Sequence, residues 1–141
     1  MSQMVVAHVL RILLVEDNDA DAYLVREALR QCGIEFELLH MKNGEQALRH
    51  MLGADTRPDL VLLDLHLPGT DGPQILRTIR SVPRLDDMPV VVVSGASTDW
   101  LKGVDISRST CLIHKSMDVD DYLRRIGDTV LALRRGGLIQ G

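Results

Sequence analysis

The sequence predicts one α/β domain in which a five-stranded parallel sheet and five helices form three layers. Two observations support this fold class: short apolar runs alternate along the chain with segments of helical periodicity, and the connections between them are short. Alternating strands and helices favour parallel pairing, with right-handed crossovers that put helices on both faces of the sheet. A chain of 141 residues is long enough to bury a single core of this kind.

The predicted strands are apolar runs bounded by turn-forming or polar residues, and they cover 10–15, 35–41, 60–63, 89–94 and 111–114. Four consecutive apolar residues, Leu60 to Leu63, lie between two proline-containing turns. Such a run is typical of a strand that is buried on both faces. The 35–41 run instead places apolar residues beside Glu35 and Glu37, which predicts a strand nearer the sheet edge.

Four of the predicted helices follow residues that are suited to N-caps, namely Asn18-Asp19, Asn43, Thr70 or Asp71, and Asp118. Asn43 and Gln46 also resemble a capping box. The last helix is predicted to bury one apolar face, made of Val119, Tyr122, Leu123, Ile126, Val130 and Leu133. The remaining helix, 97–103, has weak signals, and 82–88 is predicted to be a loop.

Composition excludes several classes of protein. The net charge of −4 and the aromatic content of 3% disfavour binding to nucleic acid or to an anionic membrane. No segment reaches the ~20 apolar residues that span a bilayer, and the N-terminus lacks the basic start of a signal peptide, so we expect a cytoplasmic protein. Cys32 and Cys111 are expected to be reduced thiols. We expect 1–9 to be a flexible leader, 10–135 the domain and 136–141 a tail.

Polar side chains lie at the carboxyl ends of four of the predicted strands: Glu16-Asp17, Asp64, Ser94 and Lys115. Because the carboxyl ends of parallel strands share one edge of a sheet, these residues are expected to meet there. Three carboxylates in one crevice repel one another unless one is protonated or a cation lies among them. Oxygen ligands of this kind suit Mg²⁺.

Asp64 is the candidate reactive residue, since it directly follows a strand predicted to be buried on both faces, where a carboxylate is costly unless it is paired, bound to a metal or used in chemistry. A metal ion, the Lys115 ammonium and the Ser94 hydroxyl around one carboxylate would neutralise the oxygens of a transferred phosphoryl group. Aspartate carboxylates are known to form such covalent phosphoryl intermediates.

In these residues the chain resembles a response-regulator receiver domain over nearly its whole length. The resemblance rests on the acidic pair Glu16-Asp17, on Asp64 followed by Pro68 and Gly72, on Ser94-Gly95, and on Lys115, each after its own strand. It implies a flavodoxin-like, doubly wound sheet with strand order 2-1-3-4-5. It also implies a phosphoprotein of two-component signalling rather than an enzyme, capable at most of self-phosphorylation and slow autodephosphorylation.

The resemblance assigns roles to the site residues. Asp64 would accept a phosphoryl group from a sensor histidine kinase. Asp17, Asp64 and the backbone carbonyl of His66 would hold Mg²⁺, with Glu16 acting through water. Ser94 would bond a phosphoryl oxygen, and Lys115 would pair with Asp64 or its phosphate.

The same resemblance implies which proteins the chain interacts with. The VEDNDADAYLVREAL and CLIHKS stretches are similar to small single-domain regulators that are paired with bacterial phytochromes. With no output domain expected in the chain, the signal would pass through contacts with a downstream protein, and dimers would form through the last strand and the last two helices.

Two positions depart from the family pattern. Leu112 stands where many members have an aromatic residue that reports phosphorylation together with the Ser94 position, and Ser116 stands where proline is usual. A cis bond before a residue other than proline costs roughly 2.5–4 kcal/mol, so we expect a trans bond or a rearranged loop. The segment before Lys115 is also about one residue short, which is why the 97–103 helix is expected to be reduced.

Two alternatives stay open. Leu112 and Ser116 are compatible with an adaptor that has this fold but works without phosphorylation. A small Mg²⁺-dependent phosphatase with an aspartate nucleophile would need a second acid two residues after Asp64, where His66 stands.

Overall fold

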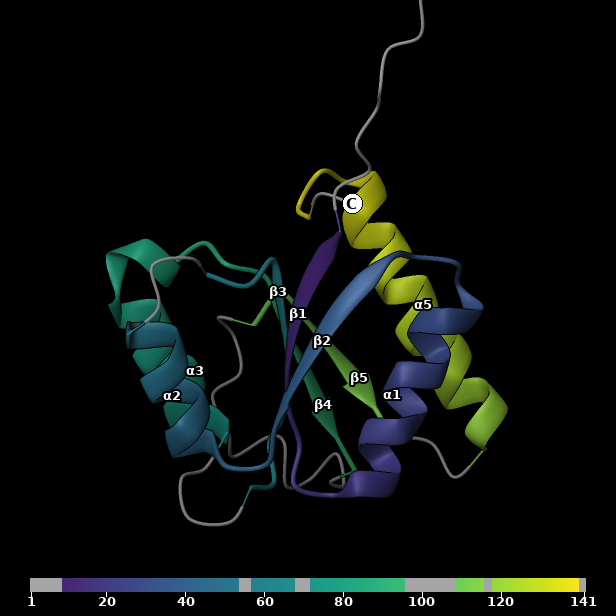
Figure 1. The fold of residues 1–141 in the computed structure, drawn as a ribbon, viewed down its shortest axis with the longest axis horizontal. Coiled ribbons are helices and arrows are strands. Elements are labelled where there is room, and N and C mark those ends of the chain that lie inside the picture. The colour runs from purple at the N-terminus through teal and green to yellow at the C-terminus, as the bar shows by residue number, and fades with distance from the viewer. Residues whose placement is uncertain (1–8, 54–56, 68–71, 96–108, 116–117, 140–141) are drawn as a thin grey trace, which may run out of the picture.

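The computed structural model describes residues 9–53, 57–67, 72–95, 109–115 and 118–139. Its centre is a five-stranded sheet in the order β2-β1-β3-β4-β5, and every neighbouring pair is parallel (Figure 1). The strands are β1 (Leu10–Val15), β2 (Phe36–Met41), β3 (Leu60–Asp64), β4 (Val90–Ser94) and β5 (Cys111–His114). The predicted parallel sheet and its strand order are therefore confirmed.

Helices cover both faces of the sheet, as predicted. They are α1 (Asp19–Gln31), α2 (Gly44–Gly53), α3 (Gly72–Ser81) and α5 (Val119–Arg135), with a short 3₁₀ helix, η1 (Pro83–Leu85), after α3. Figure 1 shows α1 and α5 side by side on one face and α2 with α3 on the other. The result is a three-layer arrangement.

The sheet separates two apolar cores. Leu10, Ile12 and Leu14 of β1 pack with buried residues of α1 and α5. Leu13 and Val15, which point to the opposite face, pack with buried residues of α2 and α3. Because successive side chains of a strand alternate between faces, β1 belongs to both cores, and β3 and β4 are buried along their whole length. This burial fixes the carboxyl ends of the central strands.

Local sequence explains where α1 and α5 begin and end. The side chains of Asn18 and Asp118 accept hydrogen bonds from backbone N–H groups in the first turns of α1 and α5, which satisfies donors that a helix otherwise leaves unpaired. Gly33, just after α1, has a φ of +76°, a conformation that glycine adopts without a steric cost. The predicted starts of α1 and α5 are therefore correct to within a residue.

The helices of the described residues differ in part from the predicted ones. The described residues contain four α-helices rather than five, and the predicted helix 97–103 lies outside them. The predicted loop 82–88 contains η1, whose following carbonyl groups accept hydrogen bonds from the buried Arg80 guanidinium. Val119, assigned to the buried face of the last helix, is 48% exposed, since as the first residue of α5 it lies at the end of the helix that extends past the core.

The strand order places the acidic residues together. β1 lies between β2 and β3, so the connections that follow the neighbouring strands β1 and β3 lead to helices on opposite faces, α1 and α3, and open a crevice at the carboxyl edge of the sheet. Glu16 follows β1, and Asp64 ends the neighbouring strand β3. This edge lies at the bottom of Figure 1, where α1 begins.

Candidate functional site

An acidic cluster lies at the carboxyl edge of the sheet. Glu16, Asp17 and Asp64 each offer a carboxylate oxygen within 4.8 Å of the others. The carboxyl groups of Glu16 and Asp64 are buried, whereas Asp17 is exposed. The three acids that the sequence predicted to meet are therefore brought together, with two of them inside the protein and one facing solvent.

Both oxygens of Asp64 are held by donors. The backbone N–H of His66 donates to Oδ1 at 2.9 Å, and Lys115 Nζ donates to Oδ2 at 3.2 Å. The side chain of Asp64 is only 5% exposed. Burying a carboxylate is costly unless it is hydrogen-bonded or paired, and here two donors from different segments fix its position.

Lys115 is bonded to three carboxylates at once. Besides Asp64, its Nζ donates to Glu16 Oε1 at 2.9 Å and to Asp21 Oδ2 at 2.7 Å. Asp21 lies in the first turn of α1, and sequence reasoning did not select it. An acidic residue in a first turn is usually explained by its favourable interaction with the helix dipole, so no local signal distinguished Asp21 from Asp19.

The ionisation of the cluster reflects burial and shared charge. Burial and a hydrogen bond with Asp64 raise the pKa of Glu16 to about 8, and Lys115 opposes this shift only in part. Burial by itself would lower the pKa of Lys115, but its hydrogen bonds to Asp21 and Glu16 outweigh that effect and raise the pKa above the usual value. Lys115 is therefore a permanent cation, whereas Glu16 changes its protonation state near neutral pH.

The donor set suits a hard divalent cation. Three carboxyl groups, from Glu16, Asp21 and Asp64, are bonded to one ammonium group, and a fourth, from Asp17, lies beside Glu16 and Asp64. An excess of buried negative charge is stabilised by protonation or by a bound cation. Oxygen-only ligands with a solvent-facing member fit ions such as Mg²⁺ or Mn²⁺, which keep part of their water shell.

The other predicted residues lie on the strands nearby. Ser94 ends β4 and is fully buried, and its carbonyl accepts a hydrogen bond from the Lys115 N–H at 2.8 Å. Leu112 of β5 pairs with Val92 and packs at the border of the α2/α3 core. The side chain of His66 is exposed. Ser116, for which a trans bond or a rearranged loop was predicted, lies outside the described residues.

Tyr122 of α5 has a buried hydroxyl group that interacts electrostatically with the acidic cluster. The residue is 2% exposed, and its hydroxyl has no hydrogen-bond partner in the described structure. Burial raises the pKa of this hydroxyl, and the charges of Lys115 and Asp21 act on it as well. The hydroxyl is therefore neutral and lies within electrostatic range of the cluster.

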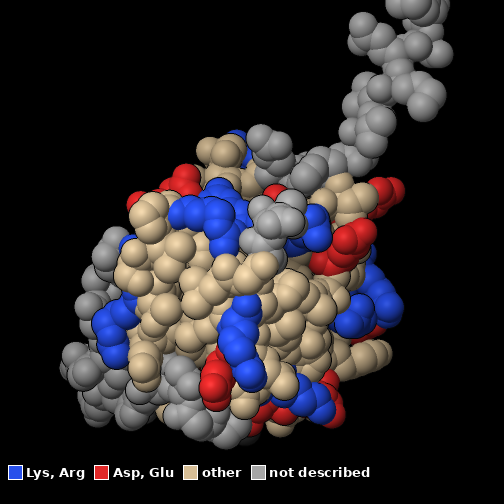
Figure 2. All heavy atoms as spheres, turned by 60° about the vertical axis from the view of Figure 1, so that its left-hand side comes forward, with Lys and Arg blue, Asp and Glu red and all other residues tan. Residues whose placement is uncertain are grey.

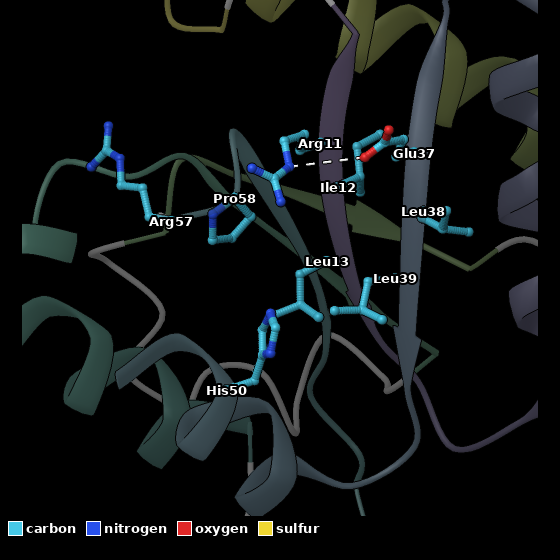
Figure 3. A pocket seen from close by; sticks show the side chains of 9 residues that line it. All are labelled: Arg11, Ile12, Leu13, Glu37, Leu38, Leu39, His50, Arg57 and Pro58. Atoms are coloured by element: carbon cyan, nitrogen blue, oxygen red, sulfur yellow. Dashed lines mark ion pairs between the residues drawn. The ribbon is translucent and has the colours of Figure 1, made fainter. Parts of the chain in front are cut away.

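A separate hollow of about 330 Å³ opens near the other end of β1, between the sheet and α2 (Figure 3). Figure 3 shows the side chains of Leu13 and Leu39 pointing toward each other near His50 of α2, with Arg11 paired with Glu37 farther up the strands. The hollow is lined by none of the predicted site residues. It is distinct from the acidic cluster.

Surface charge and hydropathy agree with the composition. On the described part of the face drawn in Figure 2, basic and acidic side chains are interspersed among uncharged ones. No helix in the described ranges is long and apolar enough to span a bilayer. Cys32 and Cys111 are free thiols, as predicted.

Comparison with known proteins identifies the family. The response regulator receiver domain matches residues 12–126, which include every residue of the acidic cluster and Lys115. The chain belongs to the response regulator receiver domain family. The sequence-based identification of a two-component receiver is thus confirmed.

Individual receivers are similar over most of the chain. Response regulator Rcp1 of Synechocystis is 34% identical over 122 residues, covering 82% of each chain. The crystal structure of the phosphorylated cyanobacterial phytochrome response regulator RcpA superimposes with a TM-score of 0.78 at 32% identity, covering 86% of this chain and 91% of that one. The Mn²⁺-bound form of Rcp1 gives 0.75 at 31% identity, covering 91% and 94%.

Some relatives are longer than this chain. The match to the transcriptional regulatory protein BaeR of Escherichia coli covers 68% of this chain but only 38% of that protein. Receiver domains therefore occur among these relatives both as most of a protein and as one part of a larger one.

Proposed function

We propose that this receiver domain accepts a phosphoryl group on Asp64 from a sensor histidine kinase, in a reaction assisted by Mg²⁺. The observation that carries the proposal is the placement of the Asp64 carboxylate. It is buried, its two oxygens are held by His66 N–H and Lys115 Nζ, and it adjoins the acids Glu16 and Asp17. A nucleophile held in a fixed orientation is what in-line phosphoryl transfer requires.

In the proposed reaction an Asp64 oxygen attacks phosphorus. As the new O–P bond forms, the bond from phosphorus to the imidazole nitrogen of the donor breaks, and its electron pair leaves with the imidazole. Bound Mg²⁺ would neutralise negative charge on the phosphoryl oxygens and on the acids that hold it. Glu16, Asp17, Asp64 and the backbone carbonyl of His66 are the proposed ligands, with Glu16 acting through water.

Lys115 and Ser94 are proposed to act on the phosphoryl oxygens. The Lys115 ammonium already contacts Asp64 Oδ2 at 3.2 Å, close to where a phosphoryl group on that residue would begin. Ser94 ends β4, the strand beside β3, and its hydroxyl is proposed to donate to a phosphoryl oxygen. Together with Leu112 on the next strand, Ser94 would form the switch that changes with phosphorylation.

Relatives indicate the signalling pathway. RcpA is described as a phytochrome response regulator and was crystallised in its phosphorylated form. We propose by analogy that a phytochrome-type histidine kinase is the donor for this chain. Unit 10–135 would then signal through contacts with a downstream protein, and dimers would form through β5, α5 and the segment between β4 and β5.

The test is the intact mass of the protein after incubation with Mg²⁺ and acetyl phosphate. We expect a gain of about 80 Da, the mass of one phosphoryl group carried as a covalent aspartyl intermediate, in the wild type and in Asp128→Asn, which removes an exposed carboxylate on α5. Asp64→Asn should gain no mass.

The alternatives give different results in the same experiment. A protein that binds no Mg²⁺ and gains no mass would be a phosphorylation-independent adaptor. Steady release of phosphate over many turnovers would instead indicate a phosphatase. A phosphoryl gain that persists in Asp64→Asn would place the acceptor elsewhere.

A further inference from the structure

Asp21 is the closest anionic partner of the lysine in the cluster. Its Oδ2 lies 2.7 Å from Lys115 Nζ, compared with 2.9 Å for Glu16 and 3.2 Å for Asp64. Asp21 is not needed to cap α1, because its own backbone N–H is the group that Asn18 Oδ1 caps, at 3.0 Å. Its side chain is therefore free to act on Lys115.

The lysine has no spare hydrogen for another acceptor in this arrangement. An ammonium group has three N–H donors, and three carboxylates lie within bonding distance of Lys115. A phosphoryl group on Asp64 would add acceptor oxygens, so one of the present partners must give way. Asp21 is 29% exposed, against 3% for Glu16 and 5% for Asp64, and water can solvate it most readily after release.

We propose that Asp21 is a positioning residue, which draws the Lys115 ammonium toward itself and leaves the contact with Asp64 the longest of the three, until a phosphoryl group takes the place of Asp21 as the partner of the lysine. This inference rests on the proposed function of Asp64. It assigns Asp21 no contact with the transferred group. Through the contact between Asp21 and Lys115, the first turn of α1 would respond to phosphorylation of Asp64.

Removing the charge of Asp21 has two consequences of opposite sign. The ammonium moves toward Glu16 and Asp64, where its charge repels a bound divalent cation, so Mg²⁺ affinity falls. At saturating Mg²⁺ the same movement brings the ammonium closer to charge that develops on the phosphoryl oxygens, so transfer becomes faster. Each effect should be about two- to fivefold, the range expected for a partly exposed ion pair.

The test compares Asp21→Asn with Asp19→Asn. Both changes remove one negative charge from the first turn of α1, but Asp19 pairs with Lys42 at 2.8 Å and not with Lys115. Calorimetry gives the Mg²⁺ affinity, and intact mass gives the rate of phosphorylation by acetyl phosphate across a Mg²⁺ series. For Asp21→Asn we expect weaker Mg²⁺ binding and a higher rate of phosphorylation at saturating Mg²⁺. For Asp19→Asn we expect only the small change in Mg²⁺ affinity that follows from losing one negative charge, and no increase in rate.

A cycle with Lys115→Gln isolates the contact between the two residues. In that background Asp21→Asn should change Mg²⁺ affinity no more than Asp19→Asn does, because the partner of Asp21 is gone. The proposal is overturned if Asp21→Asn slows transfer at saturating Mg²⁺, if it behaves like Asp19→Asn, or if its effect on affinity survives in Lys115→Gln. A wild type that binds Mg²⁺ but gains no phosphoryl group contradicts the function proposed for Asp64 alone, since the affinity cycle still decides the role of Asp21.

Discussion

At Glu16, burial and a neighbouring carboxylate outweigh the attraction of a lysine. The side chain is 3% exposed, and its pKa rises from an ordinary value near 4.5 to about 8. Between these pH values the folded protein binds more protons at Glu16 than the unfolded chain does. The free energy of unfolding falls with rising pH wherever this is so. In the metal-free protein, Glu16 therefore reduces stability progressively between about pH 4.5 and 8.

We predict that Glu16→Gln removes this loss of stability. In urea unfolding with a chelator present, the free energy of unfolding of the wild type should drop by about 1–3 kcal/mol more than that of Glu16→Gln between pH 5.5 and 8. Glu45→Gln, at an exposed position in the first turn of α2, is the control and should follow the wild type. Equal pH dependence in wild type and Glu16→Gln would contradict the raised pKa.

Residues of the site differ in how far the sequence predicts them. Glu16, Asp64 and Lys115 could be found because each directly follows an apolar strand, and parallel strands bring such positions to one edge. Asp21 could not, because its role depends on which side of α1 faces Lys115. That orientation is set by packing between α1 and α5 in a common core, which is a contact between distant parts of the chain.

Among the elements, α3 begins unusually close to the end of β3. A Cβ atom on Gly72 would lie 2.6 Å from Leu65 Cα and 2.9 Å from the Asp64 carbonyl oxygen. Both are backbone atoms that cannot rotate away. The first residue of α3 therefore has to be glycine for the helix to start this close to the strand that carries Asp64.

We predict that Gly72→Ala lowers the free energy of unfolding by about 1–3 kcal/mol, the usual cost of overpacking, because β3 and α3 must separate. The same shift should slow phosphorylation of Asp64. Gly53→Ala provides the matched control, since a Cβ atom there meets nothing within 4 Å. It should leave stability unchanged or raise it by up to about 1 kcal/mol, as measured by urea unfolding. A Gly72→Ala variant as stable as Gly53→Ala would contradict the close approach.

Helix starts were predictable because their signals are local, as the capping hydrogen bonds accepted by Asn18 and Asp118 show. The 3₁₀ helix η1 was not predictable from the sequence in this way. Its neighbourhood is stabilised by Arg80 Nη1, which donates to the carbonyl oxygens of Asp86 and Met88 at 2.9 and 2.7 Å. An arginine at the end of a helix is ordinarily explained by the helix dipole, so no local signal indicates that this one is buried against the following turn.

On the scale of the whole molecule, the acidic cluster lies at the end of strands that contribute side chains to both cores. Glu16 and Asp17 follow β1, which contributes to both cores, while Lys115 follows β5 at the sheet edge. A cation held at this junction would contact segments from distant parts of the chain. It would bind the folded protein in preference to the unfolded chain and would therefore stabilise the entire fold.

We therefore predict that Mg²⁺ at 100 times its Kd adds about 2.7 kcal/mol to the free energy of unfolding and raises Tm by roughly 5–10 °C for a domain of this size. Asp17→Asn should abolish the increase. Because Asp17 is exposed, this variant should keep a Tm close to that of the wild type in chelator. Differential scanning calorimetry with and without Mg²⁺ measures both values. An unchanged Mg²⁺ effect in Asp17→Asn would exclude Asp17 as a ligand.

The parallel sheet with helices on both faces follows from the alternation of strands and helices in the sequence. The order β2-β1-β3-β4-β5 does not, because periodicity says nothing about which strands are neighbours. That order was predictable only through the resemblance to receiver domains. It matters for the site, since it makes β1 and β3 hydrogen-bonded neighbours and so brings Glu16 beside Asp64.

The bond between Lys115 and Glu16 joins residues that are 99 positions apart in the sequence. During synthesis, the strands that carry Glu16 and Asp64 leave the ribosome well before β5. Until β5 adds to the sheet beside β4, these acids have no lysine to orient or neutralise them. If Asp64 is the acceptor, a nascent or truncated chain would offer a kinase an incomplete site, and the proposed chemistry would be restricted to polypeptides that have finished folding.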